Sequence, residues 1–217
     1  VSFEIAANER ICVAGYNRSG RSTLVQLLAG MQTDFGGTLA YNQTPMANLQ
    51  LSSLRQAIGD YSPEESIIPG TLIDNICLGH PDVGFADVQW ALGVSRLADF
   101  VTEQPKGYDT ELVAEGLNIP GSVRVRLLLA RAIVRKPRLL VLGNLLDRLE
   151  PNIRRGIMTD LTDKRQPWTL VIMTNDPEVA RVCDRVFLMR RGKMLVEGPP
   201  ELVMSDTETN EIWRSKG

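Results

Sequence analysis

A glycine-rich segment carries the clearest chemical pattern in the chain, Gly15-Tyr16-Asn17-Arg18-Ser19-Gly20-Arg21-Ser22-Thr23. Its spacing is that of G-x-x-x-x-G-K-[ST], with Arg21 in the lysine position. Glycines let backbone N–H groups close around a phosphate, and the N-terminus of a following helix adds a partial positive charge. The Ser22 hydroxyl is a candidate Mg²⁺ ligand. The residues expected to contact a nucleotide are Gly15, Asn17, Ser19, Gly20, Arg21, Ser22 and Thr23.

Arg21 leaves two interpretations of this loop open. The lysine of such loops is a compact point charge, whereas arginine is larger, planar and forked, so the exchange is not conservative. Backbone donors and the helix dipole survive any change of side chain, which favours nucleotide binding. The alternative is a strand–turn–helix that keeps its shape and binds nothing.

Alternating strand and helix patterns predict an α/β fold around the loop. The apolar runs at residues 11–14, 138–142 and 170–173 are typical of strands in a sheet that is covered on both faces. Residues 186–189 and 193–196 predict a hairpin. The helix after the loop places Leu24, Leu27 and Leu28 on one face.

The middle of the chain has a different, mostly helical pattern. We expect helices within residues 87–91, 96–103 and 122–135. The chain is therefore predicted to be one domain of residues 1–217. Its α/β lobe comprises residues 1–64 and 136–217, and residues 65–135 form an inserted helical lobe.

Composition excludes several classes of function. The net charge is −2 and the pI about 5.6, so no nucleic-acid footprint is expected. The three cysteines lack the spacing of metal ligands and favour a reducing, cytosolic compartment. No apolar stretch approaches 18 residues, so we expect no membrane span. The chain opens on a strand pattern without an initiator methionine, which predicts excision from something longer.

Four further stretches, read in order with the loop, resemble the nucleotide-binding domains of ABC transporters of the exporter and type I secretion kind. They are IGDYSPEESIIPGTLIDNICLG, PKGYDTELVAEG, RVRLLLARAIVRKPRLLVL and GKMLVEGPPEL. The resemblance implies the P-loop NTPase fold, with a RecA-like α/β lobe and an inserted helical lobe. It also implies ATP as cofactor and a place at the cytoplasmic face of a membrane. The implied partners are a transmembrane domain and a second ABC domain, in a homo- or heterodimer.

Several functional positions of the family are substituted. Arg18 falls where the loop usually has glycine. Glu64 falls on the Q-loop glutamine and remains a candidate metal ligand. The Walker B strand, which ends in Asp-Glu in the family, ends in Gly143 and Asn144. Glycine has no ligand atom, and asparagine cannot accept a proton at neutral pH.

The remaining motifs are altered as well. The LSGGQ signature falls on residues 119–123, where Pro120 has neither hydroxyl nor N–H; Ser122 is expected to cap the next helix. The D-loop falls on residues 147–150. The switch histidine falls on Asn175, which can hydrogen-bond a phosphate oxygen but cannot shuttle a proton. The adenine-stacking aromatic residue would precede Val1.

The resemblance with these substitutions predicts a domain that can bind ATP, with weak or absent Mg²⁺ binding and impaired hydrolysis, and it assigns no catalytic residue. Two alternatives stay open. One is a working ATPase in which Glu64 or Asp147 acts as the base. The other is the degenerate half of an asymmetric ABC dimer. Nothing in the sequence indicates the exported substrate.

Overall fold

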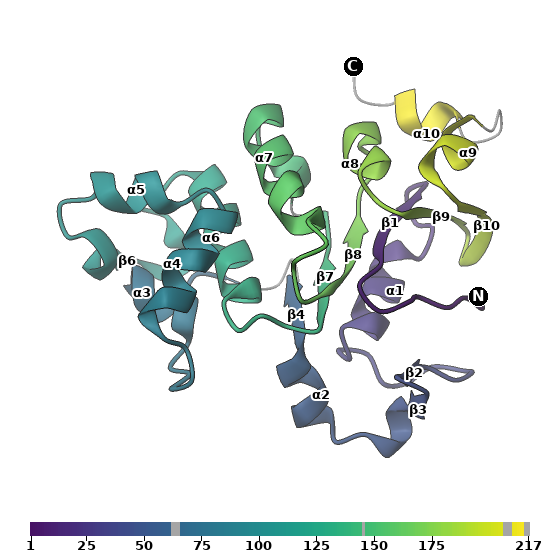
Figure 1. Ribbon diagram of the computed structural model, residues 1–217, viewed down its shortest axis with the longest axis horizontal. Helices are drawn as coiled ribbons and strands as arrows, with labels where there is room; N and C mark the ends of the chain where they lie inside the picture. Colours follow the sequence, from purple (N-terminus) through teal and green to yellow (C-terminus); the bar gives the residue numbers. More distant parts are fainter. Residues whose placement is uncertain (62–65, 145, 206–209, 215–217) are drawn as a thin grey trace.

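A six-stranded sheet runs through the molecule (Figure 1), in a computed structural model that describes residues 1–61, 66–144, 146–205 and 210–214. The strand order is β10-β9-β1-β8-β7-β4, and all neighbours are parallel except β9 and β10. The strands are β1 (Arg10–Gly15), β4 (Ile58–Tyr61), β7 (Leu139–Leu142), β8 (Thr169–Met173), β9 (Arg185–Arg190) and β10 (Lys193–Gly198). The predicted α/β class, buried strands and hairpin are confirmed.

Both faces of the sheet are covered, which is why its central strands are apolar throughout. Along β1, Ile11 and Val13 pack into one cluster, with α1 (Arg21–Leu28) and α2 (Leu51–Ala57). Cys12 and Ala14 point into the other, with α7 (Pro151–Thr162) and α8 (Pro177–Arg181). Alternate residues thus enter opposite cores.

Four helices between β4 and β7 lie beside the sheet, on the left of Figure 1. They are α3 (Leu72–Cys77), α4 (Phe85–Val94), α5 (Ala98–Glu103) and α6 (Gly121–Ile133). The helix expected from residue 96 begins later because Arg96 has a left-handed φ of 58°. The lobe boundaries at 64/65 and 135/136 stay a prediction.

Smaller elements complete the described chain. They are the strand pairs β2 (Ala40–Tyr41) with β3 (Thr44–Pro45) and β5 (Gly70–Thr71) with β6 (Glu111–Leu112), the helices α9 (Pro200–Ser205) and α10 (Asn210–Arg214), and the 3-10 turns η1 (Met46–Asn48), η2 (Gly107–Asp109), η3 (Ala114–Gly116) and η4 (Leu146–Arg148). Of the helices in the described segments, none has the length and apolar character needed to cross a bilayer.

The carboxyl ends of β1, β8 and β7 meet at one edge of the sheet, because these strands are parallel neighbours. At that edge β1 leads through the phosphate loop into α1, β7 leads into η4, and β8 leads into α8. Parallel sheets of this type bind ligands at the carboxyl ends of their strands.

Candidate functional site

The phosphate loop, residues 15–23, keeps the backbone path that its glycines permit. Gly15 has φ 154° and Gly20 has φ 92°. A Cβ on Gly15 would lie 2.2 Å from the carbonyl oxygen of Met189, so only glycine lets β1 lie this close to β9 here. Arg18 also takes a left-handed φ, 59°, which a side chain disfavours. The loop therefore closes even though Arg18 stands where glycine was expected.

Backbone hydrogen bonds fix the path of the loop. The N–H of Ser19 donates to the carbonyl of Tyr16 at 3.1 Å, and the N–H of Gly192 donates to the carbonyl of Ser19 at 2.9 Å. Ser19 is 2% exposed, and its buried hydroxyl has no hydrogen-bond partner within the described chain. No side chain caps the N-terminus of α1. These N–H and O–H groups suit a phosphate. The other predicted contacts, Asn17, Ser22 and Thr23, are exposed.

The Arg21 guanidinium is tied to the end of β8. Its Nη1 donates to Oδ1 of Asn175 at 2.7 Å, and the side chain is half-buried. Burial lowers the pKa of Arg21, and the neighbouring carboxylate of Asp147 opposes that shift. Because the pKa of a guanidinium is ordinarily far above neutral, Arg21 remains a cation at neutral pH. A fixed positive charge thus stands beside the phosphate loop.

Asn175, at the switch position, binds both backbone groups of Gly15 at the start of the loop. Its Oδ1 accepts the N–H of Gly15 at 3.0 Å, and its Nδ2 donates to the carbonyl of Gly15 at 3.1 Å. The same Oδ1 accepts the bond from Arg21. The amide was expected to be able to reach a phosphate oxygen, but here it holds the loop and its arginine.

Asp147, in η4, is joined to the end of β8. The hydroxyl of Thr174 donates to its Oδ1 at 2.7 Å. The N–H of Asp176 in turn donates to the Thr174 hydroxyl oxygen at 3.0 Å. The carboxylate considered as a substitute base is therefore part of a network that links η4 to the residues directly after β8.

A buried ion pair extends this network to α7. Arg154 Nη2 lies 2.5 Å from Oδ2 of Asp176, and their side chains are 12% and 5% exposed. Asp176 also caps α8, accepting the N–H of Glu178 at 2.8 Å. A pair this deeply buried is costly to break from one side.

Neither of the described residues directly after β7 has an acidic side chain that could hold a metal ion. Gly143 is buried and Asn144 is exposed. Over the part of the chain that the structure describes, His, Cys, Asp and Glu side chains nowhere gather in a group of three or more that could hold a metal ion. The Q-loop position, Glu64, lies outside the described residues. Ser22 could still offer its hydroxyl to a metal ion. Asp147, the described carboxylate considered as a substitute base, already accepts a hydrogen bond from Thr174. These residues do not fit a Mg²⁺ ion of the kind that the family uses.

The signature segment begins α6 in a different way from that expected. Pro120 is the N-cap, with φ −57° and ψ 147°, and Gly121 is the first helical residue. The expectation that Ser122 caps this helix is wrong: it lies one residue inside, and no side chain caps the helix. The proline ring fixes φ and supplies the non-helical cap geometry instead. Val123 is buried, so its side chain serves packing.

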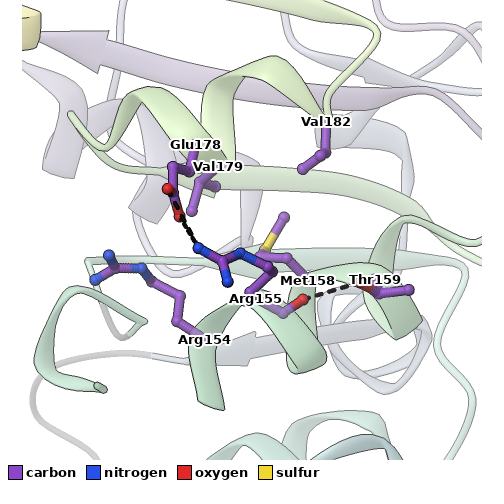
Figure 2. A pocket seen from close by; sticks show the side chains of 7 residues that line it. All are labelled: Arg154, Arg155, Met158, Thr159, Glu178, Val179 and Val182. Atoms are coloured by element: carbon purple, nitrogen blue, oxygen red, sulfur yellow. Dashed lines mark hydrogen bonds and ion pairs between the residues drawn. The ribbon is translucent and has the colours of Figure 1, made fainter. Parts of the chain in front are cut away.

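A small cavity lies between α7 and α8, away from the loop (Figure 2). Residues of the two helices line it: Arg154, Arg155, Met158, Thr159, Glu178, Val179 and Val182. Figure 2 shows the Arg155–Glu178 ion pair, 3.3 Å long, crossing it. Its volume of about 50 Å³ is room for a few water molecules, so it cannot hold a nucleotide.

Sequence reasoning missed the interactions that organise this edge. The Arg21–Asn175 bond and the Arg154–Asp176 pair join residues far apart in the chain. Only one local signal pointed to them: Asp176 followed by Pro177 is typical of a helix N-terminus. Nothing in the sequence indicated Arg154.

The geometry agrees with comparisons to known proteins. Residues 1–145 match the family model described as ABC transporter. A multidrug efflux ATP-binding/permease protein of Mycobacterium tuberculosis is 32% identical over 203 residues, 94% of this chain and 17% of the relative. A mesentericin-Y105 transport/processing ATP-binding protein of Leuconostoc mesenteroides is 30% identical over 205 residues, 94% of this chain and 28% of the relative.

A solved structure extends the agreement to nearly the whole fold. A bacterial Atm1-family ABC exporter with ATP bound superposes with a TM-score of 0.91 at 25% identity, covering 98% of this chain and 38% of that chain. The chain thus spans between 17% and 38% of the length of these proteins. On the family match and this fold, the chain belongs to the ABC transporter family.

Proposed function

We propose that this chain is the nucleotide-binding domain of an ABC exporter, at the cytoplasmic face of the membrane, and that it binds ATP but hydrolyses it poorly. The observation that carries the proposal is the engagement of Asn175. Its amide is bonded to Gly15 and Arg21, where a hydrolysing site needs an imidazole free to act on the phosphate. The loop backbone, by contrast, keeps its closed path.

Impaired turnover follows from the groups that surround the expected γ-phosphate. Removing a general base typically costs about 10²–10⁴-fold in rate, and losing an electrostatic donor costs a similar factor. Asn144 cannot serve as a base, and Gly143 cannot hold a metal. The Asp147 alternative is disfavoured because Thr174 already occupies one of its oxygens.

Steady-state phosphate release by the purified chain at millimolar MgATP tests this proposal. We expect release no faster than the buffer blank. The informative contrast is Ser22→Ala, which removes a hydroxyl of the loop. Robust release that Ser22→Ala abolishes would overturn the proposal, because it would place turnover at this site.

The partners we propose are a transmembrane domain and a second ABC domain. The relatives named as permeases and exporters are longer than this chain and include it as a part. In residues 65–135, the proposed helical lobe, exposed apolar side chains offer surface for a partner: Ile68, Leu78 and Leu117 are 43%, 44% and 72% exposed. Association with the transmembrane portion of the same transporter in detergent tests the first partner. Failure to associate would count against it.

An asymmetric dimer is favoured by the unequal state of the two motifs that meet across an ABC interface. The phosphate loop keeps its backbone path, while the signature segment has Pro120 at its cap and Val123 buried. Such a chain would pair best with an ABC domain whose signature is intact. Size-exclusion chromatography with ATP distinguishes the cases: a dimer formed by this chain alone would contradict asymmetry.

A further inference from the structure

We infer that Arg21, anchored by Asn175, takes over the role of the divalent metal, so that this site accepts ATP as the metal-free polyphosphate. The inference rests on the proposed nucleotide binding and adds the ionic form of the ligand and the residue that neutralises it. It starts from a disagreement: the family motif implies Mg²⁺, and the described residues do not fit one.

Without a metal, the triphosphate of ATP is a concentrated anion, and backbone N–H groups alone supply only partial charges. The glycine left at position 143 removes the acidic side chain that would hold a metal. The absence of an acid at position 143 shifts this edge of the sheet toward positive charge, and Arg21 keeps the cation of the loop. A polyphosphate without a metal ion requires positive charge of this kind from the protein.

The position of the Arg21 guanidinium is fixed by its neighbours. Arg21 is the first residue of α1, directly after Gly20 of the phosphate loop. Its Nη1 is held 2.7 Å from Asn175 Oδ1, and Asn175 is itself fixed to Gly15 by two bonds. The guanidinium is therefore placed before any ligand arrives. A planar fork suits the paired oxygens of a phosphate better than a lysine does.

Burial lowers the pKa of Arg21, whereas the carboxylate of Asp147 raises it. The Thr174 hydroxyl donates to this carboxylate at 2.7 Å and so keeps it beside the end of β8. In a metal-binding site, a carboxylate here would compete for the ion. Here its negative charge favours the cationic form of Arg21, whose guanidinium is hydrogen-bonded to Asn175.

Isothermal titration calorimetry of the purified chain with ATP, in EDTA and in millimolar MgCl₂, tests the inference directly. We expect Kd values within about threefold of each other in the two buffers, since no metal-bound contact is gained. Binding that requires MgCl₂ would overturn the inference and leave the proposed function standing. No binding in either buffer would overturn the proposed nucleotide binding itself.

Variants assign the effect to Arg21. Loss of a charge-assisted contact should raise Kd in EDTA about 10–100-fold in Arg21→Ala, and less in Arg21→Lys, which keeps the charge. Arg165→Ala, a matched loss of one exposed cation in the turn before β8, should leave Kd within about twofold. Thermal unfolding verifies that each variant folds. Equal affinity of folded Arg21→Ala and the parent chain would overturn the inference.

Discussion

The phosphate loop and the ends of β7 and β8 share one edge of the sheet, but they differ in the atoms on which their function depends. The loop presents backbone N–H groups, which persist when Gly-to-Arg and Lys-to-Arg changes occur at Arg18 and Arg21. The strand ends depend on side chains, and positions 143, 144 and 175 hold glycine, asparagine and asparagine. Under the proposed function, binding carried by the backbone withstands substitutions that impair hydrolysis carried by side chains.

At the ends of the strands, hydrogen bonds and an ion pair join neighbouring elements. Asn175 holds Gly15, Thr174 holds Asp147, and Asp176 holds Arg154. Consecutive residues after β8 thus join the loop, η4 and α7. If this comparison is correct, substitutions at the strand ends should change stability, and substitutions in the loop should change nucleotide binding.

The largest effect is expected for Arg154→Ala. It leaves the buried carboxylate of Asp176 without its partner, which should lower the free energy of unfolding by about 3–5 kcal/mol. Urea unfolding measures this. Arg155→Ala is the matched control on the same helix: its pair with Glu178 is exposed, so a loss below about 1 kcal/mol is expected. Equal losses would show that burial of the pair is irrelevant.

Gly15→Ala should lower the free energy of unfolding by about 1–3 kcal/mol and abolish ATP binding. A methyl group there would meet the carbonyl oxygen of Met189 at 2.2 Å, at a φ that favours glycine. Gly93→Ala, in α4 with open space around it, should instead stabilise by about 0.5–1 kcal/mol. Thermal unfolding and calorimetry check both. Undisturbed ATP binding by Gly15→Ala would contradict a loop that depends on its backbone path.

Asn175→Ala should lower the free energy of unfolding by about 1–2 kcal/mol and weaken ATP binding, because it releases both Gly15 and Arg21. Asn118→Ala is a matched control, because the Asn118 amide also makes two hydrogen bonds to the backbone. It accepts the N–H of Val113 and donates to the carbonyl of Glu111. The Asn118→Ala variant should affect stability alone. A similar loss of ATP affinity in both variants would mean that Asn175 acts only through general stability.

The smallest effect concerns acid stability at the opposite edge of the sheet, in the turn before β8. Hydrogen bonds from Arg165 lower the pKa of Asp163 to about 2 from an ordinary value of 3.8. A depressed carboxyl pKa contributes stability above the ordinary value, and the contribution is lost as pH falls from about 4 to about 2. Unfolding midpoints between pH 5 and 2 should therefore fall less steeply in Asp163→Asn. Parallel curves would contradict this assignment.

The fold was largely predictable, because apolar runs such as residues 170–173 and the glycines of the loop are local signals. The residues at the family's motif positions, such as Gly143, Asn144 and Asn175, could be read from the sequence, and their effect on hydrolysis stays a prediction. Arg154 and the bonds of Asn175 were not, since they depend on which strands become neighbours. Ser122 was misjudged because a serine near a helix start usually caps it, whereas Pro120 fixed the cap two residues earlier.

Under the proposed function, the phosphate loop binds ATP that the chain does not hydrolyse, and the identity of the bound nucleotide reports on both points. The chain is incubated overnight with radiolabelled ATP and separated by gel filtration, and the nucleotide that elutes with the protein is identified by chromatography. We predict that nucleotide co-elutes and is intact ATP. Bound ADP, or no bound nucleotide, would contradict the account.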